Sequence, residues 1–186
     1  MSLPTEIQFL GPFSLHASKS GSNSLFSQES SSKPGIYLFT VPYEGKFVPF
    51  YVGMTNKSIA ERNRAHLQGY LSGQYMVYDV NKMIKNRERV EIHKGSKNTE
   101  DFFSYAITGY KSILDMLEEV RIFYFPYECE TKILKRIESG FIKGYKKSLN
   151  NFIENRGISI NIAKNEIKMI PITINNHLLN LNDIEA

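Results

Sequence analysis

The chain has 186 residues, 41% of them hydrophobic and 23% charged, which suits one domain with a proper core and leaves too little for two. Its formal net charge is +4, and its single cysteine excludes an internal disulfide and a cysteine-based zinc site. Because no run of about 18 apolar residues and no signal-peptide pattern is present, we expect a cytoplasmic protein that contacts no membrane.

Residues 1–33 are a leader of mixed character. Two short apolar segments, Ile7–Leu10 and Phe13–Leu15, flank a Gly-Pro pair and predict a short strand or hairpin. A serine-rich, turn-like stretch follows, in which Leu25-Phe26 are the residues expected to dock on a core. We therefore expect residues 1–33 to be an N-terminal extension that packs on the main domain.

The next stretch predicts a β-hairpin. Gly35-Ile36-Tyr37 opens one run of alternating apolar residues and Tyr51-Val52-Gly53 closes the second, with Pro42, Glu44-Gly45 and Pro49 as turn residues between them. Side chains alternate with a period of two along a strand, so the two tyrosines can share one face of the sheet. An ordinary hairpin with aromatic cross-strand pairs is the competing interpretation of these two short motifs.

A helix is predicted to begin directly after the hairpin, near Ile59. Ser58 and Glu61 have the spacing of a capping box. Arg62 and His66 are four residues apart, so they share one face of that helix.

The middle of the chain predicts an insertion at about 70–97 and two further elements. Within the insertion, a strand around Tyr75, a helix over 80–86 and a strand over 90–93 are expected, and its tyrosines either contact bases or cover the core edge. A helix over 99–117, interrupted at Gly109, precedes a strand over 121–125 that we expect to be the third, central strand.

The last third of the chain predicts one more helix and two strands. Apolar residues over 132–145 recur at helical spacing, with Glu138 at the margin of the stripe. The segment 158–162 alternates as a short strand that contains Asn161, and the tail after 166 predicts an added strand or a dimer contact.

Taken in order, these motifs resemble the GIY-YIG nucleases over roughly residues 34–163. The resemblance rests on two three-residue motifs, an Arg and His four apart on a helix, a Glu on a later helix and an Asn near the end: Gly35-Ile36-Tyr37, Tyr51-Val52-Gly53, Arg62, His66, Glu138 and Asn161. Two departures are a long hairpin between the tyrosines and a long stretch from His66 to Glu138. Asn161 is the least secure match, since other asparagines lie nearby.

The resemblance implies a role for each of these residues. Tyr37 would be the general base and His66 would draw away its proton, while Tyr51 positions the phosphate or the water. Arg62 would stabilise the charge that develops on the phosphoryl oxygens, as suits an always-charged planar guanidinium. Glu138 would hold one Mg²⁺ or Mn²⁺ that completes its shell with water and phosphate oxygens. Asn161 would tie the active-site elements together.

The distribution of charge favours nucleic acid as the partner. Residues 54–97 carry nine basic and four acidic groups, and 132–168 carry nine and three, whereas 98–131 carry two basic and seven acidic groups. The two basic blocks contain the motif residues, as expected for a face that meets phosphates, although solvated charge runs are common. The predicted DNA contacts are Lys57, Arg64, Lys82, Lys85 and Arg87.

The sequence therefore predicts an α/β (α+β) fold with a small three-stranded antiparallel sheet flanked by helices. Its parts are an extension over 1–33, a nuclease domain over 34–163 and a C-terminal extension over 164–186. The expected function is a metal-dependent DNA endonuclease, and the short chain favours a restriction-type homodimer. The alternatives are a DNA-binding module that does not cut, a structure-directed repair or recombination nuclease, and an interaction domain with a coincidental hairpin.

Overall fold

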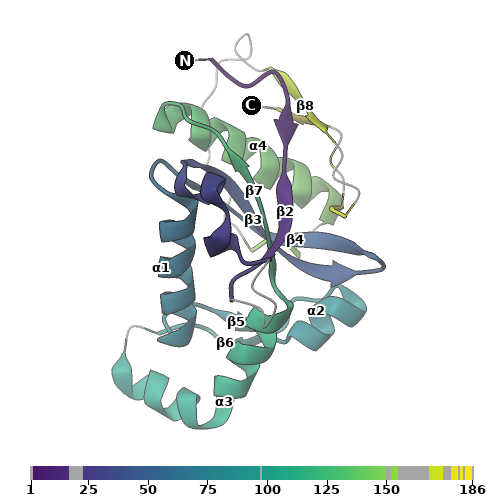
Figure 1. The fold of residues 1–186 in the computed structure, drawn as a ribbon. Helices are drawn as coiled ribbons and strands as arrows, with labels where there is room; N and C mark the ends of the chain where they lie inside the picture. The colour runs from purple at the N-terminus through teal and green to yellow at the C-terminus, as the bar shows by residue number, and fades with distance from the viewer. Residues whose placement is uncertain are drawn as a thin grey trace.

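The computed structural model describes residues 2–16, 23–96, 98–149, 152–154, 168–173, 177–179, 181 and 183–185. It is a mixed α+β fold in which a twisted central sheet crosses the molecule and helices pack around it (Figure 1). In this part of the chain, no helix is both long and apolar enough to span a bilayer.

The central sheet has four strands in the order β2-β7-β3-β4. The hairpin strands β3 (Gly35–Tyr43) and β4 (Lys46–Thr55) and the strand β7 (Arg121–Pro126) include the segments that the alternation predicted. Pro42 and Pro49, predicted as turn residues, instead lie within β3 and β4, and only Glu44-Gly45 forms the turn. The fourth strand, β2 (Leu10–Ser14), comes from the leader and pairs antiparallel with β7. The prediction of three strands therefore falls one short, and β7 is an inner strand between β2 and β3.

Among the residues that the structure describes, four α-helices surround this sheet: α1 (Ile59–Leu71), α2 (Val80–Asn86), α3 (Thr99–Glu119) and α4 (Thr131–Leu149). Helix α1 begins at Ile59 because the Ser58 hydroxyl accepts a hydrogen bond from the Glu61 amide, 3.2 Å away. Helix α3 runs unbroken through Gly109, so the expected interruption there is wrong. The Tyr105 ring occupies the space where a Cβ of residue 109 would lie. Position 109 therefore requires glycine even though the helix continues through it.

The remaining elements are short. Strands β5 (Val77–Tyr78) and β6 (Glu91–His93) form a two-stranded sheet in the 70–97 region, and the helical turns η1 (Leu25–Ser27) and η2 (Glu29–Ser32) precede β3.

A third sheet joins the two ends of the chain. It contains β1 (Ile7–Gln8), β8 (Met169–Thr173) and β9 (Asp183–Glu185), and β1 runs parallel to β8. Helix α4 approaches β9 closely at Gly140, where a Cβ would lie 2.6 Å from the Glu185 carbonyl oxygen.

Candidate functional site

The register of the hairpin places Tyr37 and Tyr51 on one face. Tyr37 lies opposite Gly53 and Phe39 lies opposite Tyr51, so the two tyrosines are diagonal neighbours with ring centroids 6.2 Å apart. A Cβ built on Gly53 would lie 2.4 Å from the Tyr37 ring and hydroxyl. Gly53 is therefore required because the Tyr37 ring lies directly over the opposite backbone.

This close approach gives a first prediction. Gly53→Ala should lower the free energy of unfolding by roughly 1–3 kcal/mol, because the added methyl displaces the Tyr37 ring. Gly45→Asn is the control: residue 45 has a φ of +76° that asparagine tolerates, and no atom lies within 4 Å of the new Cβ. Urea unfolding measures both, and equal stability of Gly53→Ala and wild type would contradict the packing.

Helix α1 brings His66 onto the same cluster. Its Nε2 lies 2.8 Å from the Tyr37 hydroxyl, and this hydrogen bond is buried. The imidazole contacts the rings of Phe39, Tyr51 and Tyr75 at centroid distances of 5.2, 5.5 and 5.4 Å. Arg62, four residues before His66, is also at this cluster, because it interacts with the phenol of Tyr37.

Burial and the Arg62 charge set the protonation states here. Burial raises the pKa of Tyr37 well above its ordinary value, and the neighbouring Tyr51 raises it further, whereas Arg62 opposes both effects. Burial and the Arg62 charge together lower the pKa of His66 to about 4. At neutral pH the imidazole is therefore uncharged, and its Nε2 can accept the hydrogen bond from the Tyr37 hydroxyl.

The lowered pKa of His66 predicts a pH dependence of stability. Unfolded His66 takes up a proton near pH 6.5, but the folded side chain does so only near pH 4, so the folded state loses stability as pH falls through this window. His66→Gln should remove a pH-dependent loss of about 3 kcal/mol between those values. Urea unfolding across pH 4 to 7 measures it, and parallel pH profiles of the two proteins would contradict the assignment.

Glu138 enters the site from α4. Its carboxylate is 7% exposed and accepts a hydrogen bond from the Met54 amide at the end of β4. Burial raises the pKa of Glu138 to about 7, although the Met54 amide, Lys135 and Arg62 all favour the charged form. Glu138 and Tyr51 also interact electrostatically.

A single buried carboxylate is compatible with one kind of metal site. No group of three or more His, Cys, Asp or Glu that could hold a metal occurs among the residues that the structure describes. This excludes a closed all-protein cage within them but suits Mg²⁺, which keeps most of its waters and uses one or two carboxylates plus substrate phosphates. Burial accounts for the raised pKa of Glu138, and perturbed pKa values of this kind cluster at functional sites.

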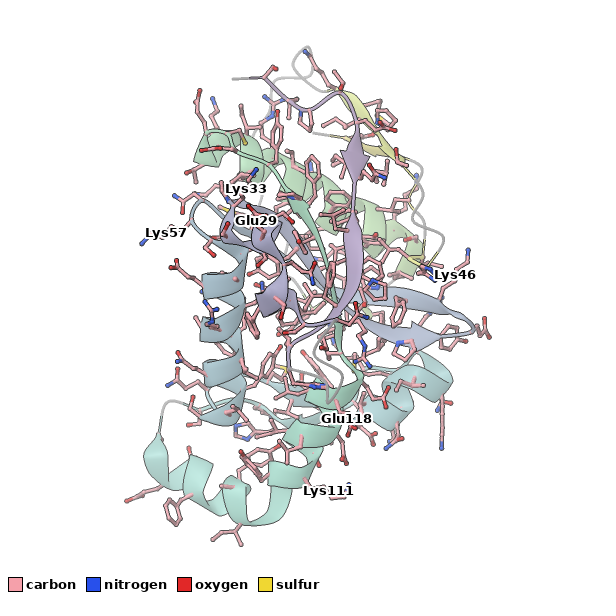
Figure 2. All side chains as sticks on the ribbon, in the orientation of Figure 1. Glu29, Lys33, Lys46, Lys57, Lys111 and Glu118 are labelled. Atoms are coloured by element: carbon pink, nitrogen blue, oxygen red, sulfur yellow. The ribbon has the colours of Figure 1, made fainter. Side chains whose placement is uncertain are left out.

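The predicted DNA contacts occur in two places. Lys57 and Arg64 belong to α1 and its entry, with the Arg64 guanidinium 5.0 Å from the Phe26 ring centroid. Lys82, Lys85 and Arg87 belong to α2 and its C-terminal end, where Arg87 lies 5.9 Å from the ring centroid of Tyr43 near the hairpin turn. Helices α1 and α2 lie on opposite sides of the molecule in Figure 1, and Lys57 extends outward beside α1 in Figure 2. Asn161 lies outside the described residues.

Three residues near the cluster were missed as site residues by the sequence analysis. Tyr75 reaches His66 because Gly69 of α1 leaves room for its ring. Lys135 lies one turn before Glu138, and Glu154 follows α4 with its amide 2.7 Å from the Phe50 carbonyl oxygen. Lys135 could have been identified from the sequence, because it lies three positions before Glu138 on the same helix. The placement of Tyr75 and Glu154 depends on packing between segments that are far apart in the chain.

Comparison of the chain with protein-family models, with curated proteins and with solved structures gives no match.

Proposed function

We propose that this protein is a metal-dependent DNA endonuclease of the GIY-YIG type. The observation that carries the proposal is the convergence of a buried tyrosine–histidine pair, an arginine and a buried carboxylate. Tyr37 bonds His66, Arg62 interacts with both Tyr37 and Glu138, and these groups come from β3, α1 and α4. Phosphodiester hydrolysis needs a proton acceptor, a charge stabiliser and a metal ligand, and this cluster contains one of each.

Each side chain then has a task. The Tyr37 hydroxyl accepts the proton of the attacking water as it passes its own proton to the neutral His66 Nε2, 2.8 Å away. Arg62 donates to the phosphoryl oxygens as negative charge develops on them. Tyr51, half-buried beside Tyr37, orients the phosphate or the water.

Glu138 would be the metal ligand of the site. Its carboxylate would bind Mg²⁺ or Mn²⁺, and the bound ion supplies charge neutralisation at the leaving oxygen. Glu138 must be ionised to do so, so its pKa of about 7 makes metal binding by the folded protein weaken as pH falls below neutrality.

DNA is the substrate that the charges favour. Exposed Arg64 lies on the helix that carries Arg62, and exposed Lys57 lies just before that helix. Exposed Lys135 lies on the helix that carries Glu138. A restriction-type homodimer is the biological arrangement we favour, because two copies related by a twofold axis can cut both strands of a duplex.

The contribution of Lys135 can be measured directly. Lys135→Ala should weaken DNA binding across unrelated sequences and lower the slope of log K against log salt by about 1, because one phosphate contact is lost. Lys111→Ala is the matched control, since Lys111 is an exposed lysine that pairs with Asp115 on α3. Fluorescence anisotropy of labelled duplexes at several salt concentrations measures both slopes, and equal slopes for Lys135→Ala and wild type would rule out the contact.

One observation favours a second candidate function, a DNA-binding module that does not cut. Tyr37 is 0% exposed, and its pKa is raised well above the ordinary value, so the unliganded site does not ionise it readily. Cleavage therefore requires that a bound metal ion bring positive charge to the phenol.

Incubation with supercoiled plasmid and genomic DNA, followed by sequencing of the ends, separates these functions. Discrete fragments that need Mg²⁺ indicate a site-specific nuclease, and nicking or smearing indicates a nonspecific or structure-directed one. Salt-sensitive binding without any cleavage would select the binding module.

A further inference from the structure

Helix α3 exposes a second apolar face. Four large side chains point away from the core: Phe103 is 67% exposed, Ile107 78%, Tyr110 42% and Leu114 47%. Their spacings of four, three and four residues align them along one side of the helix. The core side is formed by other residues, including Ile113 and Met116, which are 0% exposed. A continuous exposed stripe of this kind marks an interaction surface.

The stripe continues into a groove at its C-terminal end. Leu114 is shared by the stripe and by this apolar groove of about 420 Å³, which lies between α3, α1 and the residues that follow β2. Leucines line most of it, and Glu118 provides the carboxylate (labelled in Figure 2). The groove is therefore a socket for an apolar side chain, with one negative charge beside it.

The charge on α3 restricts what can cover this surface. The helix has five acidic residues and one lysine. Lys111 is already paired with Asp115 at 2.8 Å. Glu100 and Glu118 are exposed and lie at the two ends of the stripe. Against α3 of a second copy these charges repel each other, and they also repel anionic lipid and nucleic acid.

We propose that α3 and this groove bind an amphipathic helix of another protein, one that carries lysine or arginine beside an apolar seam. Seam residues at i, i+4, i+7 and i+11 match the α3 stripe, and the last one enters the groove. Basic residues just beyond the two ends of the seam pair with Glu100 and Glu118. Figure 1 places α3 at the opposite end of the molecule from α4 and β8, so this partner would leave the Glu138 helix uncovered.

A designed peptide tests the surface. The probe is a labelled helix of about 18 residues with leucines at the seam positions and lysines elsewhere, and fluorescence anisotropy measures its binding to the full chain. We expect it to bind at least tenfold more tightly than a peptide with the same composition but shuffled leucines, and than one with glutamate in place of lysine.

Two variants make the test specific. Ile107→Lys should weaken binding of the leucine/lysine peptide at least tenfold with unchanged thermal unfolding, because residue 107 contributes little to the core. Met169→Lys is the matched control: Met169 is 56% exposed and lies on β8, so binding should not change.

Four outcomes would overturn the proposal. These are equal binding of the shuffled peptide, no effect of Ile107→Lys, flotation of the protein with anionic vesicles, and sedimentation as a dimer that Ile107→Lys dissociates. The last would assign the stripe to a second copy of this chain.

Discussion

Glu138→Gln is expected to abolish DNA cleavage while making the protein more stable. The substitution removes the carboxylate that would bind the metal, so the cleavage rate should fall by roughly a thousandfold or more. Stability should change in the opposite direction. Burial raises the pKa of Glu138 from 4.5 to about 7, so the wild-type folded state loses stability as pH rises through that window. Glutamine has no such loss and should add about 3 kcal/mol to the free energy of unfolding at pH 8.

Thermal unfolding with and without Mg²⁺ distinguishes the loss of a metal ligand from a stability gain that comes only from removing a buried charge. Mg²⁺ should raise the Tm of wild type by mass action, and this shift should be absent in Glu138→Gln. Glu128→Gln, an exposed carboxylate just before α4, is the control and should keep both cleavage and the Mg²⁺ shift. A Mg²⁺ shift that survives in Glu138→Gln would place the metal elsewhere.

Tyr37→Phe is expected to slow cleavage by about a hundredfold to ten-thousandfold with little loss of folding. The ring stays packed over Gly53, but the hydroxyl that bonds His66 at 2.8 Å is lost, and with it the route for the proton. The free energy of unfolding should fall by about 1 kcal/mol, the usual contribution of one hydrogen bond. Single-turnover cleavage and urea unfolding measure the two effects.

Tyr124→Phe is the matched control for this variant. Tyr124 lies opposite Tyr37 on the neighbouring strand β7, is equally buried, and makes one side-chain hydrogen bond, to Ser30 at 2.6 Å. Its loss should cost similar stability without slowing cleavage. If both variants cut at the same rate, the Tyr37 hydroxyl is structural.

Local signals in the sequence were sufficient for most elements of the fold. Alternation predicted β3, β4 and β7, and the capping box predicted the first residue of α1. The fourth strand was missed because the pairing of Leu10 with Tyr124 joins segments far apart in the chain, and no local pattern encodes that. The continuity of α3 at Gly109 was also missed, because the glycine makes room for the Tyr105 ring and does not end the helix.

The candidate site was less accessible to sequence reasoning. Spacing alone placed Arg62 and His66 on one face, but the resemblance was needed to connect them with Tyr37 and Glu138. The pKa shifts of His66 and Glu138 depend on burial, which arises only when α1 and α4 pack on the sheet. Tyr75 reaches the cluster from the 70–97 region, where no local sequence pattern predicts this contact, and the role of Asn161 stays a prediction.

The most direct test of the central claim compares three reactions with supercoiled plasmid. The first contains the wild type and Mg²⁺, the second the wild type and chelator, and the third Glu138→Gln and Mg²⁺. Nicked or linear product only in the first reaction is the predicted result. Product at equal rates in the first and third reactions, or in none of them while DNA is still bound, would contradict the assignment of this cluster as a metal-dependent nuclease centre.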